Sequence, residues 1–311
     1  MKTPVLLMTF NRAAYTRKVF EKIKEAKIKK LYVANDAPRE GNVNDKKNRD
    51  QIRAMLKEID WDCELNTLFH ENNCGNGFGP VAAINWAFEK EDRLIILEDD
   101  CVPSLPFFPF CEFCLDKYEK DLRIWQVVGR SHWGGASFFE DQDYIFSYFG
   151  HTLGWATWKN RWKHFDIQMS KWESFCQAGG FYNMFPYNQA KILTERLNVL
   201  KKRPINSWDA RWGFAIRSNS GLSIVPAKNL IHNIGVFGAH SSGKITRVHK
   251  LLAEDDFQVE NEPQFIMVNR EYETYHFDNH IKTNLGQRSL VRRFLGRTKG
   301  FLVKNDILNI K

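Results

Sequence analysis

The chain has 311 residues, a formal net charge of +8 and 43% hydrophobic residues. Its length suits one large domain or two fused halves, and its composition is typical of a soluble globular protein. The positive charge favours anionic partners such as nucleotides and phosphates, but no recognised module indicates binding to nucleic acid. The first apolar run is too short for a signal peptide, and no stretch approaches the ~20 apolar residues of a membrane span, so we expect a cytoplasmic protein.

Strand-like and helix-like patterns alternate over the first hundred residues. Short apolar runs predict strands at residues 4–10, 30–34, 63–69 and 93–97. Apolar residues three or four positions apart predict helices between them, at residues 15–23, 52–59 and 80–88, with Pro80 in the first turn of the last helix. This order predicts an α/β fold with a Rossmann-like, mostly parallel central sheet and helices on both faces.

Polar residues follow each predicted strand. In open parallel sheets, ligands bind beyond the carboxyl ends of the strands, which is where these residues gather. They are Asn11 and Arg12 after the first strand, Asp36 after the second, Asn73 and Gly75 after the third, and Glu98, Asp99 and Asp100 after the fourth. The agreement among the strand ends predicts one ligand site at this edge of the sheet.

The acidic triplet Glu98-Asp99-Asp100 follows its strand directly. Adjacent carboxylates repel one another, and their hard oxygen atoms suit Mn²⁺ or Mg²⁺. Such a cation bridges to a diphosphate and neutralises charge on a leaving group. The alternative is that Asp99 or Asp100 only caps the turn before Pro103. We expect a site for a metal ion and a diphosphate.

These motifs together resemble the nucleotide-binding half of GT-A glycosyltransferases of the broad family-2 type, over roughly residues 3–105. The matching segments are Thr9-Phe10-Asn11-Arg12, Asn35-Asp36, Asn73-x-Gly75 and Glu98-Asp99-Asp100. The triplet is also similar to the metal-binding motif of the N-acetylglucosaminyltransferase that initiates complex N-glycan branching. One departure is Asp36-Ala37-Pro38, where the family often has Asp-Gly.

The resemblance implies a GT-A fold and a nucleotide-sugar donor, UDP-linked. It makes Asp100 the direct metal ligand. For Arg12, a solvated charge at the start of a helix stays open as an alternative. The nucleotide-sugar-binding residues implied are Thr9, Asn11, Arg12, Asp36, Asn73, Gly75, Glu98 and Asp99.

After about residue 130 the pattern becomes irregular and rich in aromatic residues, which predicts an acceptor-side α+β half. We expect a nucleotide-sugar-binding half at residues 1–129, an acceptor-binding and catalytic half at 130–283, and a basic tail at 284–311. From Arg288 onwards the tail carries seven basic residues against one acid. It either contacts an anionic membrane surface peripherally or forms a solvated end.

Asp209 is the candidate general base. One well-placed carboxylate can deprotonate an acceptor hydroxyl as it attacks, typically contributing ~10²–10⁴-fold. Asp209 lies between Trp208 and Trp212, and apolar walls there would raise its proton affinity. The segment also resembles the Trp-Asp base motif of the same N-acetylglucosaminyltransferase. The alternative is a structural salt bridge of Asp209 with Arg211 or another cation.

Two further features could complete the site. GT-A enzymes often carry a late histidine that touches the metal or the diphosphate, and by this resemblance His240, or less favourably His232, is a second metal ligand. Trp155, Trp158 and Trp162 fall at helical spacing, which predicts a core stripe. Indole faces also stack on sugar rings, so Trp155 and Trp208 are expected to contact the acceptor.

A zinc centre is not expected. Cys111 and Cys114 are separated by two residues in an aromatic, helix-like stretch. A zinc site would need a second cysteine pair or a histidine pair at short spacing, and we expect the chain to have neither. We expect these cysteines to be reduced thiols that pack in the core.

The features together predict a metal-dependent glycosyltransferase that moves a sugar from a nucleotide-diphosphate sugar to a hydroxyl of a glycan or lipid-linked acceptor, with inversion. One alternative is a sugar-phosphate nucleotidyltransferase, although such enzymes usually carry a glycine-rich basic loop after the first strand. Here that position reads Thr9-Phe10-Asn11-Arg12. A second alternative is a non-catalytic sugar-binding protein.

Overall fold

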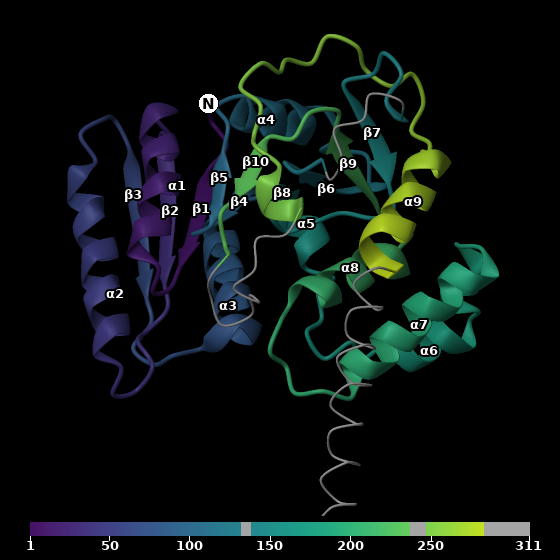
Figure 1. Ribbon diagram of the computed structural model, residues 1–311, viewed down its shortest axis with the longest axis horizontal. Helices are drawn as coiled ribbons and strands as arrows, with labels where there is room; N and C mark the ends of the chain where they lie inside the picture. Colours follow the sequence, from purple (N-terminus) through teal and green to yellow (C-terminus); the bar gives the residue numbers. More distant parts are fainter. Residues whose placement is uncertain (132–137, 237–246, 283–311) are drawn as a thin grey trace, which may run out of the picture.

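The computed structural model describes residues 1–131, 138–236 and 247–282. Within these ranges, eight strands form one sheet in the order β3-β2-β1-β4-β8-β6-β9-β7 (Figure 1). The strands are β1 (Val5–Thr9), β2 (Lys30–Asn35), β3 (Glu64–Phe69), β4 (Arg93–Glu98), β6 (Ile124–Val128), β7 (Tyr144–Ser147), β8 (Trp155–Trp158) and β9 (Leu222–Pro226). A short antiparallel pair, β5 (Cys101–Pro103) and β10 (Ile231–Asn233), lies beside it.

The four strands β3, β2, β1 and β4 run parallel, as predicted. Side chains alternate along a strand, so the inner strands β2, β1 and β4 bury residues on both faces, whereas β3 is an exposed edge strand. Leu7 packs on one face with α1 (Ala13–Glu25) and α4 (Phe107–Lys117), whereas Leu6 packs on the other with α3 (Gly75–Lys90). The structure therefore confirms an α/β fold with a mostly parallel central sheet covered by helices on both faces.

Two helices begin earlier than predicted. The helix expected at 52–59 is α2 (Val43–Met55), followed by the 3₁₀ turn Leu56–Glu58, and its start is capped by the Asn42 side chain. Helix α2 packs on the outside of α1. Helix α3 begins at Gly75, so Pro80 lies inside the helix and not in its first turn.

One continuous sheet crosses the boundary that was expected at residue 129. Strand β8 is inserted between β4 and β6 and is antiparallel to both. The run from Trp155 to Trp158 is thus a strand, and only the following turn, Lys159–Trp162, is helical. Trp158 and Trp162 are buried, as expected for core residues. The two expected halves therefore share their sheet and much of their core.

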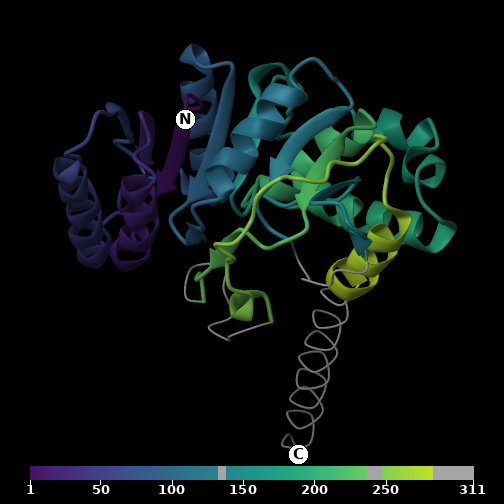
Figure 2. The same cartoon turned by 90° about the horizontal axis from the view of Figure 1, so that it is seen from above.

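The remaining helices gather around the mixed end of the sheet. Figure 2 shows them at the opposite end of the molecule from the purple helices α1 and α2. They are α6 (Trp172–Gln177), α7 (Tyr187–Lys201), α8 (Asp209–Ser218) and α9 (Arg270–His276), with a 3₁₀ turn at Gly180–Asn183. Another 3₁₀ turn, Arg247–Lys250, lies beside β10. Helix α9 continues into a π-helical segment, Phe277–Lys282.

Two further predictions concern the helices. Cys111 and Cys114 are both buried in α4, which confirms that they pack in the core. Among the described residues, no helix has the length and apolar character that crossing a membrane would require. The basic segment 288–311 lies outside the described residues, so membrane contact through it stays a prediction.

Candidate functional site

Arg12 and the acidic turn after β4 meet at the carboxyl ends of two neighbouring strands. Because β1 and β4 are parallel and paired, the residues that follow them lie side by side. Arg12 Nη1 donates to Asp100 Oδ2 over 2.8 Å, and the same guanidinium pairs with Asp99 through Nε and Nη2. Both aspartates are buried. Arg12 is therefore an ion-pair partner of the triplet and not a solvated charge at a helix start.

The segment that follows β10 lies directly on Asp100. Ile234 donates its backbone N–H to the Asp100 carbonyl oxygen over 2.9 Å, and Asn233 pairs with Cys101 across the β10–β5 ladder. A Cβ atom on Gly235 would lie 2.1 Å from Asp100 Oδ2, so any other residue there would displace the Asp100 carboxylate. This contact joins the acidic turn to a segment more than a hundred residues later.

Of the two late histidines, one lies outside the described residues. That residue is His240, so its role as a metal ligand stays a prediction. His232 lies within β10, and its Nε2 is 3.1 Å from the backbone carbonyl oxygen of His249. Its ring is thus engaged by the chain.

The acidic turn carries negative charge in excess of its cation. Arg12 supplies one positive charge to three carboxylates. Burial raises the pKa of Glu98 well above its usual range, and the charges of Asp100 and Asp99 raise it further. Burial also raises the pKa of Asp99 to about 6, against the opposing effect of Arg12. A bound divalent cation would relieve this repulsion.

The donor set can hold part of a metal's coordination shell. Asp100 offers hard carboxylate oxygens of the kind that Mn²⁺ and Mg²⁺ take. Among the described residues, however, the triplet does not bring three ligand atoms within 4.8 Å of one another. The acids therefore fit a cation whose remaining ligands come from water, from a bound diphosphate or from His240, which lies outside the described residues.

Asp209 is brought to the same site from the other end of the chain. It is the first residue of α8, it is exposed, and its charge contributes to the raised pKa of Glu98. The segment before α8 crosses α3 so closely that a Cβ on Gly77 would lie 2.7 Å from the Ile205 carbonyl oxygen. This packing fixes the start of α8 next to the acidic edge of the sheet.

The surroundings of Asp209 correct one part of the prediction and bear on its alternative. Trp208 and Trp212 are buried in the core while Asp209 is exposed, so the expected apolar walls do not enclose its carboxylate. Arg211 is also buried and donates to the carbonyl oxygens of Ser207 (2.7 Å) and Leu200 (3.3 Å). Within the described ranges, Asp209 and Arg211 form no salt bridge.

Asp36 and the loop after β3 come together, but chiefly to begin a helix. The Asp36 carboxylate accepts the backbone N–H groups of Cys74 and Gly75, each over 2.9 Å, and the Asn73 amide over 3.3 Å. Gly75 has φ +67°, which favours glycine. Asp36 thus caps α3 from a neighbouring strand end, a role that the sequence pattern did not reveal.

Thr9 and Asn11 hold the ends of β1 and β2 in place. The buried Thr9 hydroxyl donates to the Ala34 carbonyl oxygen and accepts from the Asn35 amide, both over 3.0 Å. Asn11 donates its amide to Asp45 Oδ1 over 2.6 Å. Asp45 in α2 was not predicted as part of the site; its local signal is the helix start that Asn42 and Asp45 mark.

Trp155 and Trp208 are not acceptor platforms in this structure, which corrects the prediction. Trp155 has no exposed surface and Trp208 is 2% exposed. Their ring centroids lie 5.8 Å apart within the core cluster that covers one face of the sheet. Stacking on a sugar requires an exposed indole face, which neither residue presents.

Comparisons with known proteins add little beyond this geometry. No protein-family model matches the chain, and no curated protein matches its sequence. Among solved structures, HddC from Yersinia pseudotuberculosis is 13% identical with a TM-score of 0.28, and the match spans 41% of this chain and 57% of that one.

Two other solved structures match over most of their own length. A 4-diphosphocytidyl-2C-methyl-D-erythritol synthase from Anaerococcus prevotii is 11% identical over 70% of this chain and 95% of that one, with a TM-score of 0.33. An apo UDP-glucose pyrophosphorylase is 9% identical over 79% and 96%, with a TM-score of 0.36. At these scores the likenesses carry no argument about function.

Proposed function

We propose that the chain is a metal-dependent glycosyltransferase of the GT-A type that uses a nucleotide-diphosphate sugar. The supporting observation is that Asp209, at the start of α8, lies within electrostatic reach of Glu98, the last residue of β4 and the first of the acidic triplet. A site for a diphosphate and an exposed carboxylate that can accept a proton thus share one edge of the sheet. Transfer of a glycosyl group to a hydroxyl needs both.

In this proposal Asp100 is the direct ligand of Mn²⁺ or Mg²⁺. When bound, the ion supplies electrostatic stabilisation to the leaving diphosphate. Arg12 holds the carboxylates of Asp99 and Asp100 in place and adds positive charge beside the diphosphate. His240 is proposed as a second ligand.

Asp209 acts as the general base. Its exposed position at a helix start leaves the carboxylate open to an acceptor hydroxyl, and it accepts the proton as the hydroxyl oxygen attacks the anomeric carbon. Attack on the face opposite the leaving diphosphate inverts that carbon. The acceptor class proposed is a glycan or a lipid-linked sugar.

The nucleotide, proposed to be UDP, lies against the ends of β1, β2 and β3. Thr9, Asn11 and Asp36 are already engaged with the chain, so they shape this surface and leave their remaining acceptor sites to the ligand. The residues proposed to border the nucleotide sugar are Thr9, Asn11, Arg12, Asp36, Asn73, Gly75, Glu98 and Asp99.

A ligand screen tests the proposal. The melting temperature of the full chain is measured with UDP-, GDP-, ADP- and dTDP-sugars, with and without Mn²⁺, and slow release of the nucleoside diphosphate is then followed. We expect one nucleotide class to raise the melting temperature only when Mn²⁺ is present. Asp100→Asn should lose that increase, whereas Asp62→Asn, at the opposite edge of the sheet, should keep it.

Three results would replace the proposal. If no nucleotide sugar raised the melting temperature and none were hydrolysed, the proposed glycosyltransferase activity would be ruled out. Release of pyrophosphate from a nucleoside triphosphate and a sugar 1-phosphate would make the chain a nucleotidyltransferase. Binding of glycans without turnover of any donor would make it a sugar-binding protein.

A further inference from the structure

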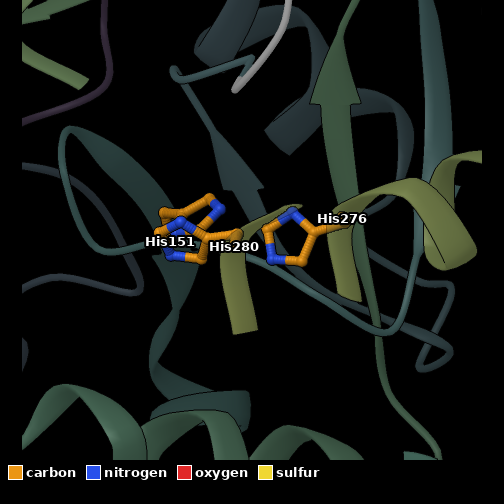
Figure 3. Close-up of side chains that lie close together, drawn as sticks. All are labelled: His151, His276 and His280. Carbon is orange, nitrogen blue, oxygen red and sulfur yellow. The ribbon is translucent and has the colours of Figure 1, made fainter. Parts of the chain in front are cut away.

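Three histidines converge at the mixed end of the sheet, outside the site described above. His151 lies in the loop between β7 and β8, His276 ends α9, and His280 lies in the π-helical segment (Figure 3). Their ring centroids are 5.0–5.1 Å apart. Each ring places one nitrogen within 4.8 Å of the corresponding nitrogens of the other two.

Burial disfavours the protonated form of the three imidazoles. Burial lowers the pKa of His151 and of His276 well below the usual range, and lowers that of His280 to about 4. The nearby charges of Arg130, Arg196 and Arg217 act in the same direction. A neutral imidazole has a lone pair on one ring nitrogen, which is the form that binds a metal ion.

The chain holds the rings in place from both sides. The Phe149 ring stacks on His276 with centroids 5.1 Å apart and an interplanar angle of 16°. The buried carboxylate of Glu273, one turn before His276, accepts from the Ser147 hydroxyl (2.6 Å) and the Tyr148 N–H (2.7 Å). These bonds fasten α9 to the segment that leads to His151, and the charges of Glu273 and Arg217 act on one another.

We propose that His151, His276 and His280 form a binding site for a divalent transition-metal ion, with Zn²⁺ preferred. Imidazole nitrogens suit Zn²⁺, whereas Mn²⁺ and Mg²⁺ prefer oxygen ligands. Zn–N bonds of about 2.0 Å place tetrahedral nitrogens about 3.3 Å apart, so ring nitrogens that lie within 4.8 Å of one another would move closer when they bind an ion. Three protein ligands leave a fourth position for water or another ligand.

Two local features favour this placement. His276 and His280 are four residues apart, so they project from the same side of the helix; the expectation that the chain has no histidine pair at short spacing overlooked them. They also span the change from α-helix to π-helix, and π-helical turns are frequent at functional sites. An ion there would tie the end of α9 to the loop after β7.

The proposed zinc site borders the acidic site without sharing a residue with it. The charge of Arg130 acts on His151 and His280, and Arg130 itself responds to the charge of Asp100. The zinc site does not rest on the proposed function, and each can fail without the other.

Direct metal binding tests this site. The tag-free full chain, dialysed against a chelator, is titrated with Zn²⁺ by calorimetry, and the loaded protein is studied by X-ray absorption. We expect one tightly bound Zn²⁺ per chain, a higher melting temperature, and a first shell dominated by imidazole nitrogen. Failure to bind stoichiometric Zn²⁺, or a first shell dominated by sulfur from the cysteines, would overturn the proposal.

Variants locate the ion. His280→Ala and His151→Ala should each weaken Zn²⁺ binding by more than about 100-fold, because loss of a direct ligand should exceed the 10–100-fold effect of an outer-shell partner. The exposed His164→Ala and the acidic-site variant Asp100→Ala should both keep the wild-type affinity. Undiminished binding by folded His280→Ala, or its loss in Asp100→Ala, would also count against the site. The X-ray absorption result on the wild type decides the matter if a variant fails to fold.

Discussion

At the parallel end of the sheet, β3, β2, β1 and β4 follow one another as strand–helix repeats, and the residues after each strand meet their neighbours at one edge. At the mixed end, β8, β6, β9 and β7 pair in both directions, and strands adjacent in the sheet come from distant parts of the chain. The candidate site needs both ends. The acidic turn belongs to the first and Asp209 to the second, while the segment after β10 belongs to the separate β5–β10 pair.

In the proposed function, donor binding depends on the parallel end of the sheet and proton transfer on the mixed end. The parallel end supplies the residues that would hold a nucleotide diphosphate: Arg12, Asp99 and Asp100 after β1 and β4. The mixed end supplies the carboxylate that would accept a proton. A variant at the mixed end should therefore lose turnover and keep donor binding, whereas a variant in the acidic turn should lose both.

Asp209→Asn is the strongest test of this separation. We expect the rate of glycosyl transfer to fall by ~10²–10⁴-fold, because the amide cannot accept the acceptor proton. The Mn²⁺-dependent affinity for the nucleotide should change by less than about threefold, since Asp209 is exposed and lies outside the acidic turn. Single-turnover kinetics and calorimetry measure the two quantities.

Asp62→Asn is the matched control, because Asp62 is also exposed but precedes β3 and so lies at the opposite edge of the sheet. Its transfer rate should equal that of the wild type. A folded Asp209→Asn protein with full activity would remove Asp209 as the base. If Asp209→Asn lost donor binding to the same extent as turnover, donor binding and proton transfer would not be separated between the two ends of the sheet.

The parallel end could be predicted largely from the sequence because its signals are local. Its buried strands are continuous apolar runs, since side chains of both faces are covered by helices. At the mixed end, Trp155, Trp158 and Trp162 fall at a helical spacing, yet the first two belong to a strand. That strand is fixed by its pairing with β4 and β6, and pairing partners so far along the chain leave no local signal.

The site shows the same division. Arg12, Asp99 and Asp100 could be placed together because parallel neighbouring strands end at one edge. The contact of Gly235 with Asp100 could not, because it depends on the β5–β10 pair. The histidine cluster likewise joins a loop after β7 to the end of α9, and the sequence shows only the His276 and His280 half of it.

Trp208→Ala tests whether the aromatic residues of the mixed end serve packing or the acceptor. Trp208 is 2% exposed and packs against Trp155 and Trp162. Removal of a buried tryptophan should lower the free energy of unfolding by about 3–5 kcal/mol, measured by urea denaturation. Tyr187→Ala is the aromatic control: Tyr187 is 69% exposed, so its loss should cost no more than about 0.5 kcal/mol.

An acceptor platform would give a different pattern. If Trp208→Ala kept the stability of the wild type and raised only the Michaelis constant for the acceptor, the packing assignment would be wrong. The correction made for Trp155 and Trp208 would then have to be withdrawn.

The smallest effect is expected at the parallel end, where an ion pair supports a strand end. Hydrogen bonds from Arg39, and then from Asn11, lower the pKa of Asp45 to about 2 from its ordinary value of 3.8. Because the folded-state pKa is the lower one, the carboxylate stabilises the fold above about pH 4, and this contribution is lost as the pH falls toward 2. Arg39 is half exposed, so solvent screening limits the contribution to about 1–2 kcal/mol.

Asp45→Asn should therefore be less stable than the wild type at pH 7 by about that amount, and the difference should shrink as the pH falls below 4. Urea denaturation at several pH values, over the range in which both proteins stay folded, measures it. Asp62→Asn should stay within about 0.5 kcal/mol of the wild type at pH 7. If the difference in free energy of unfolding between Asp45→Asn and the wild type were instead the same at every pH, it would come from lost packing at the start of α2. The contact of Asn11 with residue 45 would then not depend on the charge of the Asp45 carboxylate.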